Sequence, residues 1–180
     1  MEREKLMPIT LLMLDVDGVL TDGTILYSDS GEEIKAFNVR DGHGIKLLMR
    51  AGIEVALLTA RESKVVLHRA RDLGIRDVYQ KAIDKLAAYR SIIAEKKIED
   101  KNVCFVGDDI IDIPVLRRVG FSAAVADAVP EVKEVVDYVT IQAGGKGAVR
   151  EVCELLLKAQ NTWERVTEKY SLPGDFSRCT

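Results

Sequence analysis

The 180-residue sequence has no apolar run long enough to cross a bilayer, and no leader-like apolar stretch follows the charged residues 1–5. Cysteine is scarce: the three residues are scattered, which does not suit a disulfide framework and is typical of a reducing cytoplasm. Charge of one sign is not in excess either, because the net charge is only −3. We therefore expect a cytoplasmic protein that has neither nucleic acid nor a membrane as a partner.

The chain does have enough hydrophobic residues for a buried core, since they make up 47% of a sequence of single-domain length. Short apolar runs alternate with segments of helical periodicity, which predicts an α/β fold with a doubly wound parallel sheet. Residues 24–38 break this alternation with two short β-favouring runs and are predicted to form a β-hairpin insertion. No room is left for a cap domain. We expect one domain over 1–160 and a C-terminal tail over 161–180.

The apolar run Leu11–Leu14 is predicted to be a buried strand, and it leads directly into Asp15, Asp17 and Gly18. Open α/β sheets bind ligands just beyond the carboxyl ends of their strands. Glycine at position 18 lets the backbone approach a ligand closely. An aspartate at this edge is placed to attack a phosphorus atom.

Other polar residues are predicted to meet at the same edge of the sheet. They are Thr59 after the strand at 53–58, Lys85 at the start of a long helix, and Asp108, Asp109 and Asp112 after the strand at 103–106. Each cluster alone is commonplace as a cap, a turn or a solvated side chain. Together they supply a nucleophile, carboxylates for a cation and donors for phosphoryl oxygens, as phosphoryl transfer requires.

Residue chemistry suggests a role for each group. Asp15 is the candidate nucleophile that forms an aspartyl-phosphate, and Asp17 is the candidate acid and base. Crowded carboxylates need a cation, and Mg²⁺ is the hard ion that oxygen ligands favour. The remaining roles are a hydrogen bond to the phosphoryl group from Thr59, charge neutralisation by Lys85, metal binding by Asp108, and support of the metal shell by Asp109 or Asp112.

These motifs resemble those of the haloacid dehalogenase superfamily. The match consists of Asp15-x-Asp17-Gly18-x-x-Thr21-Asp22, Thr59, Lys85 and Gly107-Asp108-Asp109-x-x-Asp112. Residues 17–23, the hairpin, residues 38–45 and residues 144–151 further resemble the 3-deoxy-D-manno-octulosonate 8-phosphate phosphatase family. The resemblance covers roughly 9–159 and leaves the tail unexplained.

The resemblance implies a capless, Mg²⁺-dependent phosphatase that hydrolyses a sugar-acid phosphate in lipopolysaccharide precursor biosynthesis. It also implies a homotetramer in which neighbouring subunits complete each site. The implied metal ligands are the side chains of Asp15 and Asp108 and the carbonyl of Asp17. The implied substrate-binding residues are Asp17, Asn38, Val39, Arg40, Asp41, Gly42, Lys46, Arg61, Arg69, Lys85 and Lys146, some of them supplied by a neighbour.

Three alternatives remain open at this point. A phosphatase for a nine-carbon sialic-type sugar acid would use the same scaffold, with Arg61 as the discriminating position. A receiver-like signalling domain would place its acceptor aspartate after the third strand, which is not the order here. A silent oligomerisation module would not need Asp15, Asp17, Lys85 and Asp108 together. The hairpin carries a separate expectation: the hairpins of several subunits should pair into a shared sheet or barrel, because an isolated two-stranded sheet is barely stable in water.

Overall fold

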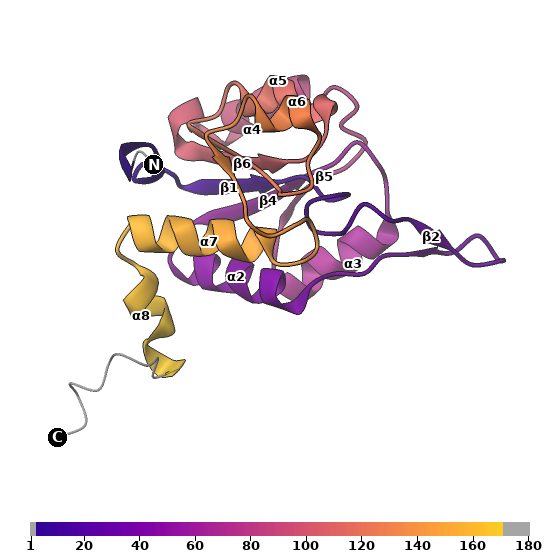
Figure 1. The fold of residues 1–180 in the computed structure, drawn as a ribbon, viewed down its shortest axis with the longest axis horizontal. Coiled ribbons are helices and arrows are strands. Elements are labelled where there is room, and N and C mark those ends of the chain that lie inside the picture. The colour runs from indigo at the N-terminus through magenta and orange to yellow at the C-terminus, as the bar shows by residue number, and fades with distance from the viewer. Residues whose placement is uncertain (1–2, 171–180) are drawn as a thin grey trace.

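The computed structural model describes residues 3–170 and confirms the predicted α/β architecture (Figure 1). The main sheet contains β1 (Leu11–Leu14), β4 (Glu54–Leu58), β5 (Asp77–Tyr79), β6 (Val103–Gly107), β7 (Phe121–Ala124) and β8 (Tyr138–Val139). The helices are α1 (Arg3–Leu6), α2 (Val39–Arg50), α3 (Lys64–Leu73), α4 (Lys85–Lys96), α5 (Ile113–Leu116), α6 (Pro130–Lys133), α7 (Ala148–Ala159) and α8 (Trp163–Thr167), with short 3-10 turns η1 (Asp100–Asn102), η2 (Ile110–Asp112) and η3 (Glu168–Tyr170).

The strands run parallel in the order β5-β4-β1-β6-β7-β8. Strand β1 is buried along its whole length because it lies between β4 and β6. In its register, Leu14 lies opposite Leu57 on one side and Val106 on the other. The chain leaves β1 in one direction and β6 in the other, so the switch point of the sheet lies beside their carboxyl ends. Asp15 and Asp108 follow these two strands.

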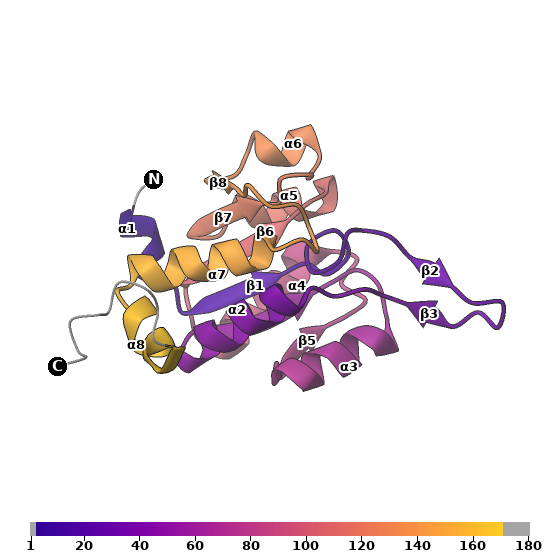
Figure 2. The ribbon, with the colours of Figure 1, turned by 60° about the horizontal axis from the view of Figure 1, so that its bottom comes forward.

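Helices cover both faces of the sheet, with α2, α3 and α7 on one side and α4, α5 and α6 on the other (Figures 1 and 2). The contact between α2 and α7 is close because α2 carries glycine at position 44. A Cβ atom at Gly44 would lie only 3.1 Å from the Cα of Arg150 in α7. The packing against α7 holds α2 in position, and with it residues 35–38, which connect the hairpin to α2.

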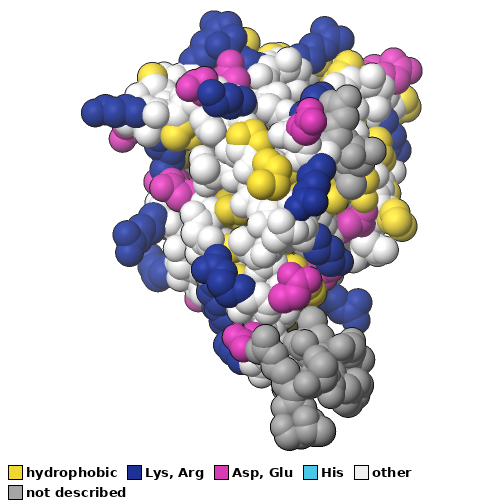
Figure 3. All heavy atoms as spheres, turned by 90° about the vertical axis from the view of Figure 1, so that its left-hand side faces the viewer, with side chains coloured by type: hydrophobic (Ala, Val, Ile, Leu, Met, Phe, Trp, Pro, Cys, Tyr) yellow, Lys and Arg dark blue, Asp and Glu magenta, His cyan; other side chains and the backbone are white. Residues whose placement is uncertain are grey.

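The insertion predicted at 24–38 is an antiparallel hairpin of β2 (Leu26–Tyr27) and β3 (Glu33–Ile34) that projects from the domain (Figure 2). Its apolar side chains Leu26, Tyr27 and Ile34 are each more than half exposed. The opposite face, near the chain ends, shows interspersed basic and acidic side chains with small apolar areas between them (Figure 3). The hairpin therefore presents apolar surface that its own chain leaves uncovered.

Two segments differ in detail from the expectation. The sequence predicts one helix over 111–119 after β6. The structure instead has the turn η2 followed by the short helix α5, because Pro114 has no N–H with which to bond the carbonyl of Ile110. The described part of the expected tail contains α8 and η3, in which Val166 and Thr167 are buried. Residues 171–180 lie outside the described range. Among residues 3–170, no helix has the length and apolarity that crossing a bilayer requires.

Candidate active site

Lys85 and Asp15 meet at the carboxyl edge of the sheet. The Asp15 backbone N–H donates to the Val106 carbonyl at 3.0 Å, which continues the β1–β6 ladder up to this residue. Lys85 is the first residue of α4, whose amino end is capped by the Asp84 side chain. The Lys85 ammonium nitrogen lies 2.8 Å from Asp15 Oδ1. Both side chains are buried, so this ion pair is shielded from solvent.

The loop after β6 supplies the other carboxylates. Asp112 is fully buried and accepts hydrogen bonds from Lys85 Nζ at 2.6 Å and from the backbone N–H of Asp108 at 3.0 Å. Asp109 is exposed, and its side chain accepts from the Ile110 N–H at the start of η2. Of the two carboxylates expected to support the metal shell, the structure therefore places Asp112, and not Asp109, beside Lys85.

Asp15, Asp108 and Asp112 form an acidic cluster in which one oxygen from each lies within 4.8 Å of the others. Burial, together with the negative charge of Asp112, outweighs Lys85 and raises the pKa of Asp15 to about 6. Burial and the charges of Asp15 and Asp112 raise the pKa of Asp108 to about 8. Asp108 Oδ1 is buried without a hydrogen-bond partner. A hard divalent cation fits these oxygens and would relieve their repulsion.

Gly18 brings the loop after β1 against Asp108. Its φ of +95° lies in the left-handed region, and a Cβ atom there would fall 2.0 Å from Asp108 Oδ2. The Thr21 hydroxyl accepts from the Gly18 N–H at 3.3 Å and holds this turn closed. Glycine at this position is therefore required both by the backbone angle and by the space that Asp108 occupies.

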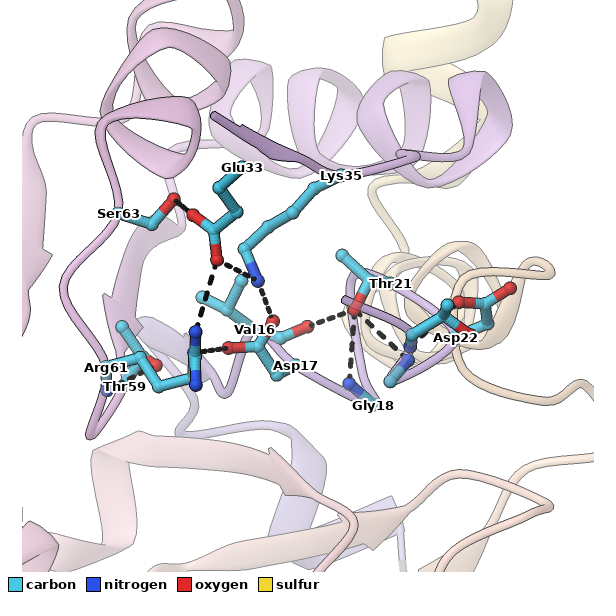
Figure 4. A network of polar contacts seen from close by, with 12 residues as sticks. Val16, Asp17, Gly18, Thr21, Asp22, Glu33, Lys35, Thr59, Arg61 and Ser63 are labelled. Atoms are coloured by element: carbon cyan, nitrogen blue, oxygen red, sulfur yellow. Dashed lines mark hydrogen bonds and ion pairs between the residues drawn. The ribbon is translucent and has the colours of Figure 1, made fainter. Parts of the chain in front are cut away.

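Asp17 lies beside the hairpin and not within the acidic cluster (Figure 4). Its Oδ1 accepts a hydrogen bond from the buried ammonium of Lys35, and its Oδ2 lies 3.7 Å from Arg61 Nε. Lys35 Nζ also lies 3.3 Å from Glu33 Oε1. Glu33 and Lys35 are not among the site residues predicted from the sequence. Their spacing of two residues, which places both on one face of a strand, was the available signal.

Thr59 and Arg61 follow β4 at the same edge. Thr59 is buried, and its hydroxyl accepts from the Arg61 N–H at 3.3 Å. The Arg61 guanidinium is partly exposed and donates to the Tyr27 hydroxyl at 3.1 Å and to Glu33 Oε1 at 3.4 Å. Arg61 is thereby held against the hairpin, close to Asp17.

The segment 38–42 forms the amino end of α2, and its side chains make contacts that stabilise the fold. Asn38 caps the helix by accepting from the Arg40 N–H at 2.8 Å, while Val39 is exposed. The buried Asp41 carboxylate accepts from the Arg150 N–H at 2.7 Å, near the amino end of α7. Burial raises the pKa of Asp41 despite these backbone donors. The Asp41 side chain thus ties α2 to α7.

The remaining residues of the predicted substrate set lie around two open cavities. One, of about 410 Å³, is lined by 36–40, Asp22, Gly145 and Lys146. The other, of about 290 Å³, is lined by Lys46, Arg69, Val39, Gly42, His43, Arg50, Leu73 and Tyr170. Neither lining includes Asp15 or Asp108. A larger cavity of about 560 Å³ lies at the amino ends of β4 and β5, away from the acidic cluster, and its lining includes Glu54 and Asp77.

Known proteins share both the sequence and this architecture. The family model for haloacid dehalogenase-like hydrolases matches residues 69–152. The 3-deoxy-D-manno-octulosonate 8-phosphate phosphatase KdsC of Escherichia coli strain K12 is 54% identical over 152 residues, which cover 84% of this chain and 81% of that protein. Its counterpart in Yersinia pestis is 50% identical over 159 residues, or 88% of this chain and 85% of that protein. The chain belongs to the 3-deoxy-D-manno-octulosonate 8-phosphate phosphatase family.

Solved structures of this family superpose closely on the chain. The phosphatase from Yersinia pestis gives a TM-score of 0.88 at 48% identity, covering 90% of this chain and 88% of that one. The phosphatase from Moraxella catarrhalis was solved with a magnesium ion, a phosphate ion and a KDO molecule. It gives a TM-score of 0.92 at 41% identity, covering 94% of this chain and 97% of that one. Membership in this family makes the protein a phosphatase with a haloacid dehalogenase-like core, and it confirms the predicted fold and enzyme class.

Proposed function

We propose that the protein is a Mg²⁺-dependent phosphomonoesterase that hydrolyses 3-deoxy-D-manno-octulosonate 8-phosphate to the free sugar acid and phosphate. Family membership supports this substrate. The observation that carries the chemistry is the buried Lys85 ammonium between Asp15 and Asp112, with Asp108 beside them at the switch point of the sheet.

The side chains of Asp15 and Asp108 and the backbone carbonyl of Asp17 would hold Mg²⁺. When bound, the cation supplies positive charge to the oxygens of the transferring phosphoryl group. Asp112 is bonded to Lys85 and keeps the ammonium directed toward Asp15. These residues match the oxygen ligands that Mg²⁺ prefers.

The reaction takes place in two displacements at phosphorus. Asp15 attacks the phosphorus, the bond to the sugar oxygen breaks, and Asp17 gives its proton to that oxygen, which leaves an aspartyl-phosphate and the free sugar acid. Asp17 then takes a proton from a water molecule, whose oxygen attacks the phosphorus. The bond to Asp15 breaks and phosphate leaves. Thr59 donates to a phosphoryl oxygen, and Lys85 balances the charge on Asp15 and on the phosphoryl group.

The proposed substrate carries a phosphate at one end and a carboxylate at the other, and we assign basic residues to both. Arg61, beside Asp17, is placed for the sugar portion, and an arginine fork suits a carboxylate. Lys46 and Arg69 line a cavity whose lining does not include the acidic cluster of their own chain. We therefore propose that these two residues serve the site of a neighbouring subunit. We include a homotetramer built through the projecting hairpins in the proposal.

The same proposal places the enzyme in lipopolysaccharide precursor biosynthesis in the cytoplasm. It is tested by phosphate release from the eight-carbon and nine-carbon sugar-acid phosphates, each with Mg²⁺ and with a chelator. Mg²⁺-dependent turnover that favours the eight-carbon substrate supports it. Faster turnover of the nine-carbon substrate would move the assignment to the sialic-type sugar acid. Absence of turnover on both would leave a silent oligomerisation module.

A further inference from the structure

Two lysines among residues 3–170 are buried, and each bonds to one of the two aspartates that follow β1. Lys85 contacts Asp15, and Lys35 contacts Asp17. The side chain of Lys35 has no exposed surface, although it extends from a hairpin whose apolar residues lie in solvent. Burying an ammonium group is unfavourable unless it is paired with a negative charge. The buried ammonium of Lys35 is therefore accounted for by its two carboxylate partners, Asp17 and Glu33.

The contacts of Lys35 fix the Asp17 carboxyl group from one side. Lys35 Nζ donates to Asp17 Oδ1, and an ammonium group is a donor that has no acceptor site. Asp17 Oδ1 therefore stays an acceptor. Asp17 Oδ2 lies 3.7 Å from Arg61 Nε, beyond hydrogen-bond distance, so Oδ2 is the oxygen left to exchange a proton with a ligand. Figure 4 shows Lys35 reaching Asp17 from the hairpin side, with Glu33 next to it. Glu33 Oε1, 3.3 Å from the same ammonium, balances its charge.

The hairpin itself is tied to the loop after β4 by the same group of residues. Glu33 accepts hydrogen bonds from the Ser63 hydroxyl and from Arg61 Nη2. Arg61 Nη2 also lies 3.1 Å from the Tyr27 hydroxyl. Each strand of the hairpin thus has a polar contact to the rim of the site. These contacts hold the hairpin in place, and the hairpin in turn positions the backbone of Lys35.

We propose that Lys35 is a positioning residue that holds the Asp17 carboxyl group with Oδ2 directed at the leaving oxygen. This rests on the role of Asp17 as acid in the proposed function. In the first displacement, the proton on Asp17 Oδ2 passes to the leaving sugar oxygen as its bond to phosphorus breaks, and Asp17 becomes a carboxylate. In the second, Oδ2 takes the proton of the attacking water. Lys35 gives up no proton in either step.

The test compares two leaving groups with Mg²⁺ present, using single-turnover kinetics for the rate of leaving-group release and steady-state kinetics for KM. A sugar or other alkyl phosphate needs a proton on its leaving oxygen, whereas p-nitrophenyl phosphate releases a stable anion. We expect Lys35→Met to slow release of the alcohol by on the order of 10- to 100-fold, within the range for acid catalysis. Release of p-nitrophenol should fall by less than about fivefold, and KM for both substrates should change by less than about threefold, since neither depends on that proton. Lys35→Arg, which keeps a charged donor, should restore most of the alcohol release.

Lys101→Met, which alters an exposed lysine away from this edge, is the matched control and should leave both rates unchanged. Equal losses on the two substrates, or a change in KM alone, would overturn the positioning role. If Lys35→Met does not fold, Lys35→Gln keeps an N–H donor on a side chain one bond shorter. It should show a smaller loss that again falls mainly on the alkyl substrate. An equal loss on both substrates in that variant would also overturn it.

A double-mutant cycle separates this inference from the proposed function. In an Asp17→Asn background, Lys35→Met should cause no further loss of alcohol release, because Lys35 acts through Asp17. Fully additive losses would contradict the inference while leaving the phosphatase intact. Wild-type protein that releases no alcohol from any sugar-acid phosphate would instead contradict the proposed function.

Discussion

The ammonium nitrogen of Lys85 lies 2.8 Å from Asp15 Oδ1, and both side chains are buried at the carboxyl edge of the sheet. Asp112 contacts the same nitrogen at 2.6 Å. The charges of Asp15 and Asp112 outweigh the effect of burial and raise the pKa of Lys85. Replacing Lys85 by methionine would leave these carboxylates without their shared cation.

We expect Lys85→Met to lower the free energy of unfolding by about 3–5 kcal/mol in metal-free protein, as removal of one partner from a buried ion pair does. Phosphate release should also be lost. Urea unfolding followed by circular dichroism measures the first effect, with Lys101→Met as the control. A change below about 1 kcal/mol, typical of an exposed pair, would contradict the buried arrangement.

Asp15→Asn tests the nucleophile. The amide keeps the size of the side chain but is not a nucleophile toward phosphorus, so turnover should fall by more than about 10³-fold while the protein stays folded. The measurement is steady-state phosphate release with Mg²⁺. Asp72→Asn, at an exposed position of α3, is the control and should keep wild-type turnover. Substantial activity in Asp15→Asn would remove this aspartate from the reaction.

Mg²⁺ binding should depend on pH in a definite direction. The pKa values of Asp15 and Asp108 are raised to about 6 and about 8, above the ordinary value of 3.8. In metal-free protein, folding therefore favours the protonated forms of Asp15 and Asp108. The stability gained in this way is complete below pH 4 and is lost as the pH rises through 6 and 8. Since the cation binds the ionised carboxylates, the rise in Tm caused by Mg²⁺ should be larger at pH 8 than at pH 5.

The same linkage predicts that Mg²⁺ displaces about one proton at pH 7 from the pair of Asp15 and Asp108. Titration calorimetry in buffers of different ionisation enthalpy measures this number directly. An equal Tm increase at pH 5 and pH 8, with no proton release, would show that the cation binds elsewhere.

Gly18→Ala should damage the metal site selectively. The added Cβ would fall 2.0 Å from Asp108 Oδ2, so Asp108 must move, and we expect Mg²⁺ affinity to fall by at least about tenfold. Gly31→Ala is a matched control, because Gly31 also has a positive φ, of +81°, but no heavy atom within 4 Å of the new Cβ. Both variants carry a strain of roughly 1–2 kcal/mol, but only Gly18→Ala should weaken Mg²⁺ binding. Equal affinities in the two variants would contradict the prediction.

The hairpin should be the contact through which subunits assemble. Ile34 is paired with Leu26 across the hairpin and is 53% exposed. Ile34→Asp should shift the protein from tetramer to smaller species in sedimentation velocity, because it places a charge in the apolar contact. Ile141→Asp, at a position 82% exposed outside the hairpin, should leave the assembly unchanged. A wild-type monomer at micromolar concentration would contradict the tetramer.

Much of the active edge could be predicted because it follows the order of strands along the chain. A buried apolar strand that ends in Asp15 and another that ends before Asp108 must open at the same edge if the sheet is parallel. The sequence could not choose between Asp109 and Asp112 as the partner of Lys85. Which of the two faces Lys85 depends on the conformation of the turn η2. In the folded loop Asp109 caps this turn and Pro114 follows it at the start of α5.

The sequence by itself determined the sheet, the hairpin and the residues available at its carboxyl edge, because apolar periodicity and local turns are short-range properties. Only the tertiary structure decided which charges meet. It buried Lys35 against Asp17, used Asp41 to hold α7, and left Lys46 and Arg69 around a separate cavity. Pairings of this kind depend on the path of the hairpin and the packing of α2 on α7, and these contacts join residues that no local pattern in the sequence connects.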